Sequence, residues 1–467
     1  MTTSPHPIQP PSAAAPPPGC PAHAGGAGPV RLLESDVAPQ DLYEQLRAAH
    51  GPVVPVLLPG DLEAWLVVGY NEILHVLRNP NEFSCDSRNW TAAKDGRLTA
   101  DNPLLPLTQY QPLIAFTDGE AHARLRDSVV YGLERFNRHG IRRYVTRFAN
   151  DLIEQVAVRG RADLVADFAE PLPAMVLTRQ FGIAAELALP LGRAVRDMVR
   201  GTETALASNT FVVETMRDLV RAKRRTPGDD FASWLLAHES ALTDVEAEEH
   251  LRHALVAGIE NTVNLIANTL RVVLTDQRFH GSLSGGSLTL PDALDHVMWE
   301  APPLTLIPNR WAVAPVMLGD QHIRPGDMVL LSLAAGNRDP QVRADLSLPM
   351  HGNRSHLAFG GGRHECPGMD IGRTIADTGI DILLAELSGL RLAVPGADLP
   401  VEVGFISSPL ASLPVEFTPH RAAPAAAGDP APAAAEPPVR PTAPPVAARP
   451  RRSRWGWLTG LLGGRRS

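Results

Sequence analysis

Phe359-Gly-Gly-Gly-Arg-His-Glu-Cys-Pro-Gly368 is the most informative stretch of this 467-residue sequence. An apolar periodic segment from Ile375 to Leu387 follows it, so the sequence predicts a glycine-rich loop that presents Cys366 just before a helix. The free N–H groups and the positive dipole end of a helix N-terminus favour a thiolate over a thiol. The loop glycines remove β-carbons where a flat ligand would need close approach of the backbone, and His364 could donate to an anion at the rim of such a ligand.

Other interpretations of this stretch stay open at the level of single residues. A lone cysteine can be a small buried hydrophobic residue, and a Gly-Gly-Gly run can be only a turn. A zinc site of His356, His364 and Cys366 is a further alternative. A structural zinc site uses four ligands, however, and no second ordered cysteine is expected nearby.

The pattern Phe-Gly-x-Gly-x-His-x-Cys-x-Gly resembles the haem-binding loop of the cytochromes P450 at every specified position. The resemblance implies a mainly α fold with small β-sheets, haem b as the cofactor, and Cys366 as the axial thiolate ligand. It also implies that Phe359 packs near the sulfur and that His364 meets a haem propionate. The glycines that it assigns to the cofactor site are Gly360, Gly362 and Gly368. Thiolate ligation favours O–O cleavage, which is the chemical reason for a cysteine here.

Hydrophobic periodicity separately predicts a mainly α domain with a small β portion. The segments with helical spacing are 41–49, 71–77, 121–132, 141–158, 172–181, 184–199, 211–224, 231–237 and 244–274. The short extended segments are 53–58, 65–68, 311–318, 328–332 and 413–417.

Two further segments resemble cofactor-binding parts of the same family. Asp118-Gly-Glu-Ala-His-Ala-Arg-Leu-Arg126 looks like the C-helix motif, in which His122 and Arg126 lie four residues apart on one helical face and reach the propionates. A solvated basic face that includes Arg124 is the alternative. Arg310 follows a Pro-Asn turn and matches the family's third propionate partner.

Ala254-Leu-Val-Ala-Gly-Ile-Glu-Asn-Thr262 resembles the I helix, which crosses the distal haem face and brings Ala257 and Gly258 to the cofactor. A mid-helix glycine costs about 0.8–1 kcal/mol relative to alanine, and the family's reason for it is a local kink. Glu260 falls on the family's acid position, which implies proton delivery, and a paired surface charge is the alternative. Asn261 stands where threonine is usual, and a carboxamide has no hydroxyl proton to pass along.

The K helix shows a larger departure from the family. Its usual Glu-x-x-Arg positions align with His296 and Trp299, which cannot form a carboxylate–guanidinium pair. The third member of that network aligns with Arg354 or His351. We expect packed apolar residues to replace the ions, since such a replacement can be neutral for stability. The segment from Asp295 to Trp299 is similar to an acid-x-x-Leu-Trp pattern of a small actinobacterial P450 lineage.

Composition divides the chain into four parts. Residues 1–30 and 422–448 are Ala/Pro-rich and are predicted to be disordered, while 31–421 form one haem domain. Residues 449–467 hold six arginines, two tryptophans and no acid, which predicts contact with an anionic membrane surface or an acidic protein.

Several classes of protein are excluded by simple counts. No run of 18 apolar residues is present, and the first residues lack the basic and apolar regions of a signal peptide, so secretion is not expected. Three scattered cysteines favour the cytoplasm. A net charge of −8 argues against nucleic acid as a partner.

The function implied by the resemblance is oxidation of a hydrophobic small molecule by a monooxygenase or oxidase. Electrons come from a ferredoxin and its reductase, because no flavin or iron–sulfur segment is evident. The expected pocket walls are 85–110, 178–210, 253–258, 303–308 and 406–411. The alternative is a haem protein with little turnover that serves as a partner in a membrane-associated signalling complex through residues 449–467.

Overall fold

The computed structural model describes residues 30–32, 39–100, 102–280, 288–346, 348, 350, 352–402 and 404–420. The two Ala/Pro-rich segments and the basic tail lie outside the described residues, apart from Val30. Their predicted roles therefore stay predictions. Among the described residues, no helix combines the length and the apolar character needed to cross a bilayer.

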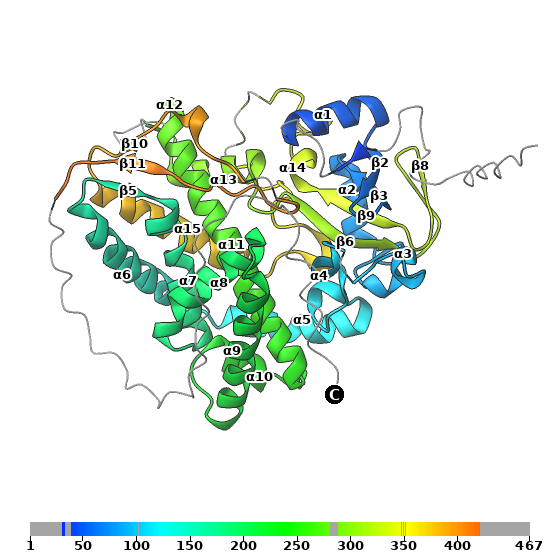
Figure 1. The fold of residues 1–467 in the computed structure, drawn as a ribbon, viewed down its shortest axis with the longest axis horizontal. Helices are drawn as coiled ribbons and strands as arrows, with labels where there is room; N and C mark the ends of the chain where they lie inside the picture. Colours follow the sequence, from blue (N-terminus) through cyan, green and yellow to red (C-terminus); the bar gives the residue numbers. More distant parts are fainter. Residues whose placement is uncertain are drawn as a thin grey trace, which may run out of the picture.

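Helices make up most of the described chain, and the larger ones gather on the side of the molecule opposite the main sheet (Figure 1). The α-helices are α1 (Pro39–His50), α2 (Tyr70–Arg78), α3 (Thr91–Lys94), α4 (Leu105–Thr108), α5 (Gly119–Glu134), α6 (Arg138–Ala157), α7 (Pro171–Phe181), α8 (Ala188–Arg200), α9 (Ala205–Arg225), α10 (Phe231–Ala237), α11 (Asp244–Thr275), α12 (Gln277–His280), α13 (Leu290–Glu300), α14 (Leu333–Gly336) and α15 (Met369–Glu386).

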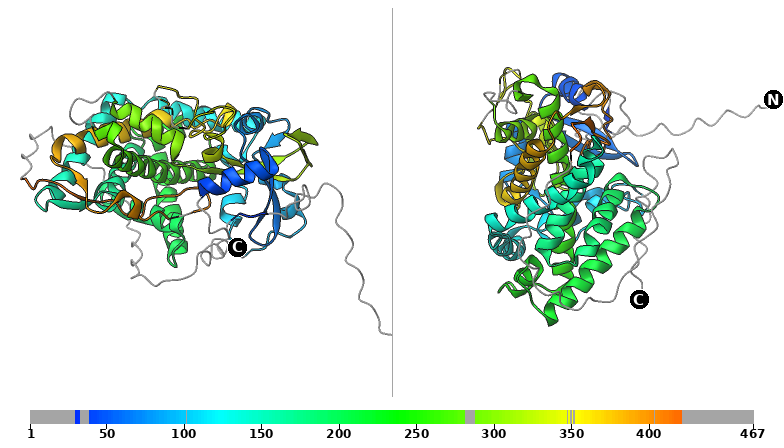
Figure 2. Two further views of the ribbon diagram at one scale, coloured as in Figure 1. Left: turned by 90° about the horizontal axis from the view of Figure 1, so that it is seen from above. Right: turned by 90° about the vertical axis from the view of Figure 1, so that its left-hand side faces the viewer.

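Helix α11 has 32 residues and runs through the middle of the helical part (Figure 2). It begins at a capping box, in which Thr243 Oγ1 accepts from the Glu246 N–H and the Glu246 carboxylate accepts from the Thr243 N–H. Helices α7, α9, α13 and α15 pack against it. Residues 262–270 of α11 are all buried, because neighbours cover the helix on every side there.

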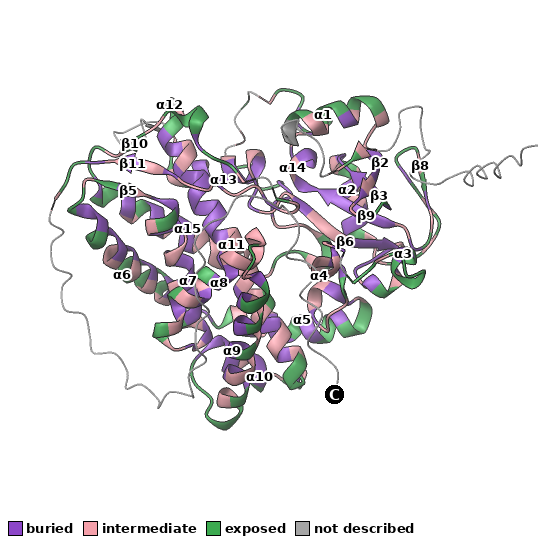
Figure 3. Ribbon diagram, viewed as in Figure 1, coloured by how far each residue is buried: buried purple, intermediate pink, exposed green. Residues whose placement is uncertain are grey.

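The main sheet has the strand order β1-β2-β3-β9-β6-β4. Its strands are β1 (Val30–Arg31), β2 (Val53–Leu58), β3 (Leu62–Val67), β4 (Phe83–Ser84), β6 (Leu306–Ala312) and β9 (Met328–Ser332). Figure 3 shows that the central strands are buried, while exposed residues lie on the outer faces of helices such as α6 and α9. Strand β6 has one extra residue relative to β9 between Ile307 and Arg310, which is a β-bulge.

Two smaller sheets complete the β portion of the described chain. The strands β5 (Arg161–Asp163), β10 (Arg391–Leu392) and β11 (Pro414–Glu416) form one, and β7 (Val316–Leu318) and β8 (Gln321–Ile323) form the other. The predicted fold class, mainly α with small sheets, is confirmed. The expectation of a single strand over 311–318 is wrong, since a turn that contains Pro315 separates β6 from β7.

Candidate functional site

The cysteine loop directly precedes helix α15, as expected. The Cys366 N–H donates to the Phe359 carbonyl at 2.9 Å, which closes the loop on itself. Gly362 has φ of +66°, and a β-carbon there would lie 2.3 Å from the Leu77 carbonyl oxygen of α2. At this position, therefore, glycine is required by the loop conformation and by helix α2.

The Cys366 side chain is accessible to solvent although protein atoms surround it on most sides. This burial raises the pKa of the Cys366 thiol, while a hydrogen bond from the Gly368 N–H acts in the opposite direction. A sulfur that is enclosed yet accessible fits a ligand position inside the molecule. Gly368 leaves room beside it, because a β-carbon at Gly368 would lie 4.0 Å from the sulfur.

Helix α5 brings two polar side chains to the cysteine loop. His122 is buried, and its ring centroid lies 4.1 Å from that of His364. Arg126 donates through Nη2 to the Glu365 carbonyl at 2.8 Å. His122 Nε2 and Arg126 Nη1 are buried and have no hydrogen-bond partner among the described residues. Burial, followed by the charges of His364 and Arg126, lowers the pKa of His122 to about 4.

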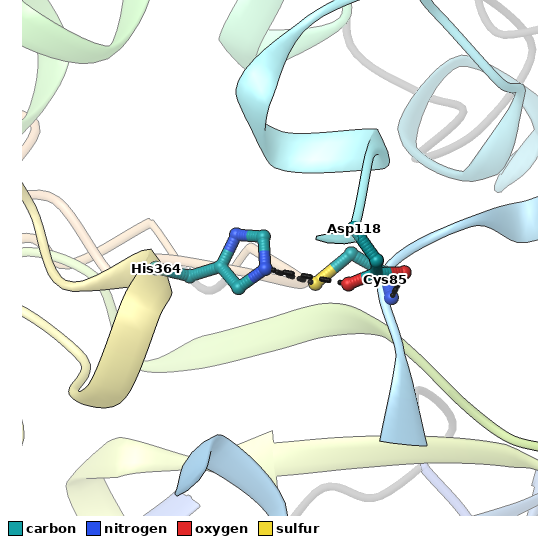
Figure 4. Close-up of side chains that lie close together, drawn as sticks. All are labelled: Cys85, Asp118 and His364. Atoms are coloured by element: carbon teal, nitrogen blue, oxygen red, sulfur yellow. Dashed lines mark hydrogen bonds and ion pairs between the residues drawn. The ribbon is translucent and has the colours of Figure 1, made fainter. Parts of the chain in front are cut away.

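Asp118, the residue before α5, holds His364 in place (Figure 4). Its carboxylate accepts from Ser84 Oγ at 2.5 Å and from the Cys85 N–H at 2.9 Å, and its second oxygen lies 3.4 Å from His364 Nε2. Burial alone would raise the pKa of Asp118, but the hydrogen bonds from His364, Ser84 and Cys85 lower it to about 2. Asp118 is therefore an ionised anchor for the histidine.

Cys85, Asp118 and His364 also form the one group of potential metal ligands found among the described residues (Figure 4). Cys85 Sγ lies 3.3 Å from His364 Nε2. Burial raises the pKa of Cys85 to about 12, so this sulfur stays a thiol. A structural zinc site uses thiolates and four ligands. The zinc alternative of His356, His364 and Cys366 is not assembled either, since these three do not form such a group.

Arg310 approaches the same cluster from strand β6. It is buried, donates to the Asn309 carbonyl at 2.7 Å, and its charge acts on both His364 and Cys85. Strand β6 thus contributes one guanidinium, the cysteine loop one imidazole, and helix α5 one of each. The unpartnered His122 Nε2 and Arg126 Nη1 fit the carboxylates of a cofactor that is held by the nearby cysteine, and haem b has that chemistry.

Glu260 lies on α11 and faces a small cavity. The cavity has a volume of about 20 Å³, and its lining includes Glu170, Arg196, Glu260 and Asn264. That volume has room for about one water molecule. Glu260 accepts a hydrogen bond from Asn264 Nδ2 at 3.1 Å, and burial raises the pKa of the Glu260 carboxyl. The alternative of a paired surface charge is therefore wrong for the described structure.

The neighbours of Glu260 on α11 differ in their surroundings. Asn261 is half-buried, and its carboxamide has no hydrogen-bond partner among the described residues. Thr262 is buried and points toward Gly372 of α15, so it does not take the place of Asn261. Ala257 and Gly258 are half-buried. Helix α11 continues without interruption through Gly258, where a β-carbon would lie 2.9 Å from Leu177, so the structure explains this glycine by packing and shows no break at it.

Helix α13 corrects the expectation that apolar residues replace an ion network. Asp295 is buried and pairs with Arg373 of α15 at 2.6 Å. Glu300, the last residue of α13, lies 2.7 Å from Arg338 and 2.6 Å from Arg343. The carboxylates therefore stand one residue before His296 and one residue after Trp299, rather than at these positions.

Trp299 is fully buried, as expected, but it belongs to the polar network. Its Nε1 donates to the Asn353 carbonyl at 2.8 Å, and the Arg343 guanidinium lies 5.6 Å from its ring centroid. Arg343 is the third member of the network, and the expectation of Arg354 is wrong because Arg354 is exposed. The His351 side chain lies outside the described residues.

Sequence reasoning missed Asp118, Cys85 and the partners of α13. Asp118 is the N-cap residue of α5, but its carboxylate makes no capping hydrogen bond, so a capping pattern in the sequence could not have shown its role. The arginines that pair with the carboxylates of α13 could not be found from the sequence, because no local sequence pattern marks them. His253 of α11 lies within the expected pocket wall 253–258, but the sequence analysis did not identify it individually. Its side chain is accessible to solvent, but protein atoms surround it on most sides, and this enclosure, followed by the charge of Arg252, lowers its pKa to about 4.

The fold and the cysteine loop define a haem-thiolate protein. No family model matches the chain. Cytochrome P450 107B1 of Saccharopolyspora erythraea is 28% identical over 401 residues, which cover 84% of this chain and 98% of that relative. Mycinamicin IV hydroxylase/epoxidase of Micromonospora griseorubida is 28% identical over 376 residues, which cover 78% of this chain and 92% of the relative.

Solved structures show the same likeness. CYP154A1 from Streptomyces coelicolor A3(2) has a TM-score of 0.73 at 27% identity, covering 83% of this chain and all of that structure. CYP154C4 from Streptomyces sp. ATCC 11861 has a TM-score of 0.77 at 26% identity, covering 84% of this chain and 98% of that structure. The chain is a bacterial cytochrome P450, an oxidoreductase of the family that binds haem b through a cysteine thiolate.

Proposed function

We propose that this P450 is a monooxygenase or oxidase of a hydrophobic small molecule, with Cys366 as the iron ligand. The observation that carries the proposal is the enclosed, accessible Cys366 sulfur beside polar groups that lack partners. His122, Arg126, Arg310 and His364 would bind the two propionates, and Asp118 would hold His364 in position. Phe359, Gly360 and Gly362 would complete the loop around the sulfur.

When bound, haem supplies the activation of dioxygen by two electrons, which protein side chains cannot provide. The chain's own part on the distal side is proton supply. The Glu260 carboxyl has a raised pKa and can hold a proton, and Asn264 fixes its orientation. The small cavity beside Glu170 and Arg196 has room for a water molecule that reloads it.

Asn261 and His253 would meet the substrate from α11. Residues 253, 257 and 261 are spaced four apart, so they follow one face of the helix. Asn261 offers a donor and an acceptor without a competing partner in the described chain, and His253 stays neutral at pH 7. A largely apolar substrate with a hydrogen-bonding group fits this face. The names of relatives, a mycinamicin IV hydroxylase/epoxidase and a nocardicin C N-oxygenase, give the range of chemistry in the family.

Electrons would come from a ferredoxin and its reductase. Exposed arginines surround the cysteine loop and the start of α6, which suits an acidic electron donor; they include Arg135, Arg138, Arg142 and Arg363. We place the protein in the cytoplasm, with a peripheral membrane contact through residues 449–467 as a further part of the proposal. A role as a partner protein with little turnover is the competing function, and its basis is the sequence alignment that places Asn261 where the family usually has threonine.

A reduced carbon monoxide difference spectrum tests the cysteine ligand. The haem-loaded wild type is expected to show the absorbance band that names the family, and Cys366→Ala is expected to lose it. Cys85→Ala is the matched control and should keep the band, because Cys85 is a neutral thiol beside His364, which would bind a propionate. A band that survives in Cys366→Ala contradicts the assignment.

Consumption of NADPH with a surrogate ferredoxin and reductase separates the enzyme from the competing function. Substrate-dependent consumption that is lost in Cys366→Ala supports the enzyme. A ligated haem without turnover for any candidate substrate, together with loss of membrane or protein binding on deletion of residues 449–467, supports the partner protein.

A further inference from the structure

A cleft of about 550 Å³ lies at the far end of α11, away from Glu260 and Asn261. Its walls come from the last turns of α11 and from the segment that follows strand β10, which lie side by side near α12 (Figure 1). Arg271 is 13 positions beyond Gly258 on the same helix. At a rise of 1.5 Å per residue this separation is about 20 Å, so the cleft is not part of the proposed distal pocket.

The side chains that line the cleft are aliphatic apart from the charged Arg271 and the polar Thr275. Its residues are Arg271, Leu274, Thr275, Leu392, Val394, Pro395, Gly396 and Ala397. Ligand sites in proteins are commonly clefts of about 300–1,000 Å³, and the volume of this cleft falls within that range.

The charged side chain, Arg271, has no counter-ion among the described residues. Its Nε is buried, and no group in the described part of the chain accepts a hydrogen bond from this guanidinium. Burial lowers the pKa of Arg271, and no neighbouring charge of either sign contributes to that shift. Three other buried or half-buried arginines of the described residues, Arg310, Arg343 and Arg373, each have a hydrogen-bond or ion-pair partner.

An unpaired, partly buried guanidinium is costly, because part of its hydration is lost and no hydrogen bond replaces it. The negative end of the α11 dipole lies one turn away and offers only about 0.3–1 kcal/mol. A carboxylate would satisfy the guanidinium with two parallel hydrogen bonds, which is the geometry that arginine recognises best.

We propose that this cleft binds a small amphiphilic carboxylate, with its anionic head on Arg271 and its aliphatic part against Leu274, Leu392 and Val394. The site is separate from the haem. Its ligand therefore binds without changing the iron environment, in contrast to a substrate that enters the distal pocket.

Titration of the full-length, haem-loaded protein with sodium octanoate tests the proposal. Calorimetry reports all binding, and the Soret absorbance recorded on the same samples reports binding next to the haem. We expect a calorimetric binding event that leaves the Soret band unchanged. Arg271→Gln should weaken this event at least about tenfold, and 1-octanol, which has the same chain length without the charge, should bind the wild type at least about tenfold more weakly.

Two variants separate loss of the site from loss of the fold. Ala397→Trp changes an exposed residue at the rim, and it should block the cleft while Arg271 stays in place. Arg147→Gln removes an exposed arginine of α6 and should bind octanoate like the wild type. The proposal is overturned if octanoate binds only with a Soret shift, if it does not bind, or if Arg271→Gln and Ala397→Trp both keep the wild-type affinity.

Discussion

The sequences of helices α13 and α11 both depart from the family pattern. Neighbouring residues compensate for the departure in α13, but not for the one in α11. In α13 the sequence comparison predicts that His296 and Trp299 take the usual acid and base positions, and the carboxylates directly beside that pair, Asp295 and Glu300, pair with arginines on other elements. In α11 Asn261 replaces a threonine, and no neighbour supplies the missing hydroxyl, because Thr262 faces α15.

The difference follows from what each position has to do. A network of ions that joins helices can move by a residue, because long arginine side chains from several elements can still reach the new carboxylate. A group that must face one spot on a ligand cannot move by a residue, since one step along a helix turns the side chain by about 100°. A structural role therefore tolerates relocation more readily than a role at a single point in space.

The largest expected effect concerns the α13 network. Asp295→Ala leaves Arg373 partly buried without its partner, and we expect a loss of about 3–5 kcal/mol in the free energy of unfolding, measured by chemical denaturation. Glu416→Ala breaks an exposed pair with Arg391 and should cost at most about 1 kcal/mol. Equal losses in the two variants would show that the α13 ions do not join the helices.

The next effect concerns proton supply from α11. Glu260→Gln removes the proton that the carboxyl can deliver, so NADPH consumption with a surrogate ferredoxin should fall about 10²-fold while the carbon monoxide spectrum stays unchanged. Glu214→Gln, an exposed acid on α9, is the matched control. Unchanged consumption in Glu260→Gln would mean that protons arrive by another route.

A smaller effect is expected in the pH dependence of stability. Because burial raises the pKa of Glu260 above its ordinary value of 4.5, the folded protein binds more protons than the unfolded chain above that pH. Its contribution to the free energy of unfolding should therefore fall as the pH rises from about 4.5 through the folded pKa. The free energy of unfolding of Glu260→Gln, measured at a series of pH values, should lack this decrease. That of Glu214→Gln should keep it.

The smallest effect concerns the uncompensated position. Asn261→Thr restores a hydroxyl that both donates and accepts a hydrogen bond. We expect the yield of hydrogen peroxide for each NADPH consumed to fall by less than about tenfold. An increase in peroxide would show that the surroundings of Asn261 are adapted to a carboxamide.

Much of the fold could be predicted from sequence, since long periodic segments and one specific loop define it. The helix over 231–237 and the strands over 53–58 and 328–332 match the structure at both ends. The start of β6 was missed, because Leu306-Ile-Pro-Asn309 contains residues that are unfavourable in strands. Helix α15 begins earlier than its apolar pattern, because its first turn is half-exposed and shows no periodicity.

The residues of the candidate site also fall into two groups, those that sequence motifs identify and those that only the tertiary structure reveals. His122, Arg126, Arg310 and His364 follow from motifs, and the structure brings them together, although their roles toward haem stay predictions. The α13 pairs could not be predicted, since Arg373 lies 78 residues from Asp295 and only the tertiary fold brings them together. Arg271 also has no local signal, because an arginine on a long helix is ordinary until its surroundings are known.

The bulge in strand β6 has a consequence for how this chain can vary in length. Side chains alternate between the two faces of a strand, so the residue inserted between Ile307 and Arg310 determines which face Arg310 occupies. Deletion of a single residue there would turn the guanidinium away from the cysteine loop while most strand pairing survives. The spacing from Ile307 to Arg310 is thus a length that homologous exchange or engineering has to preserve, even where the residues themselves are changed.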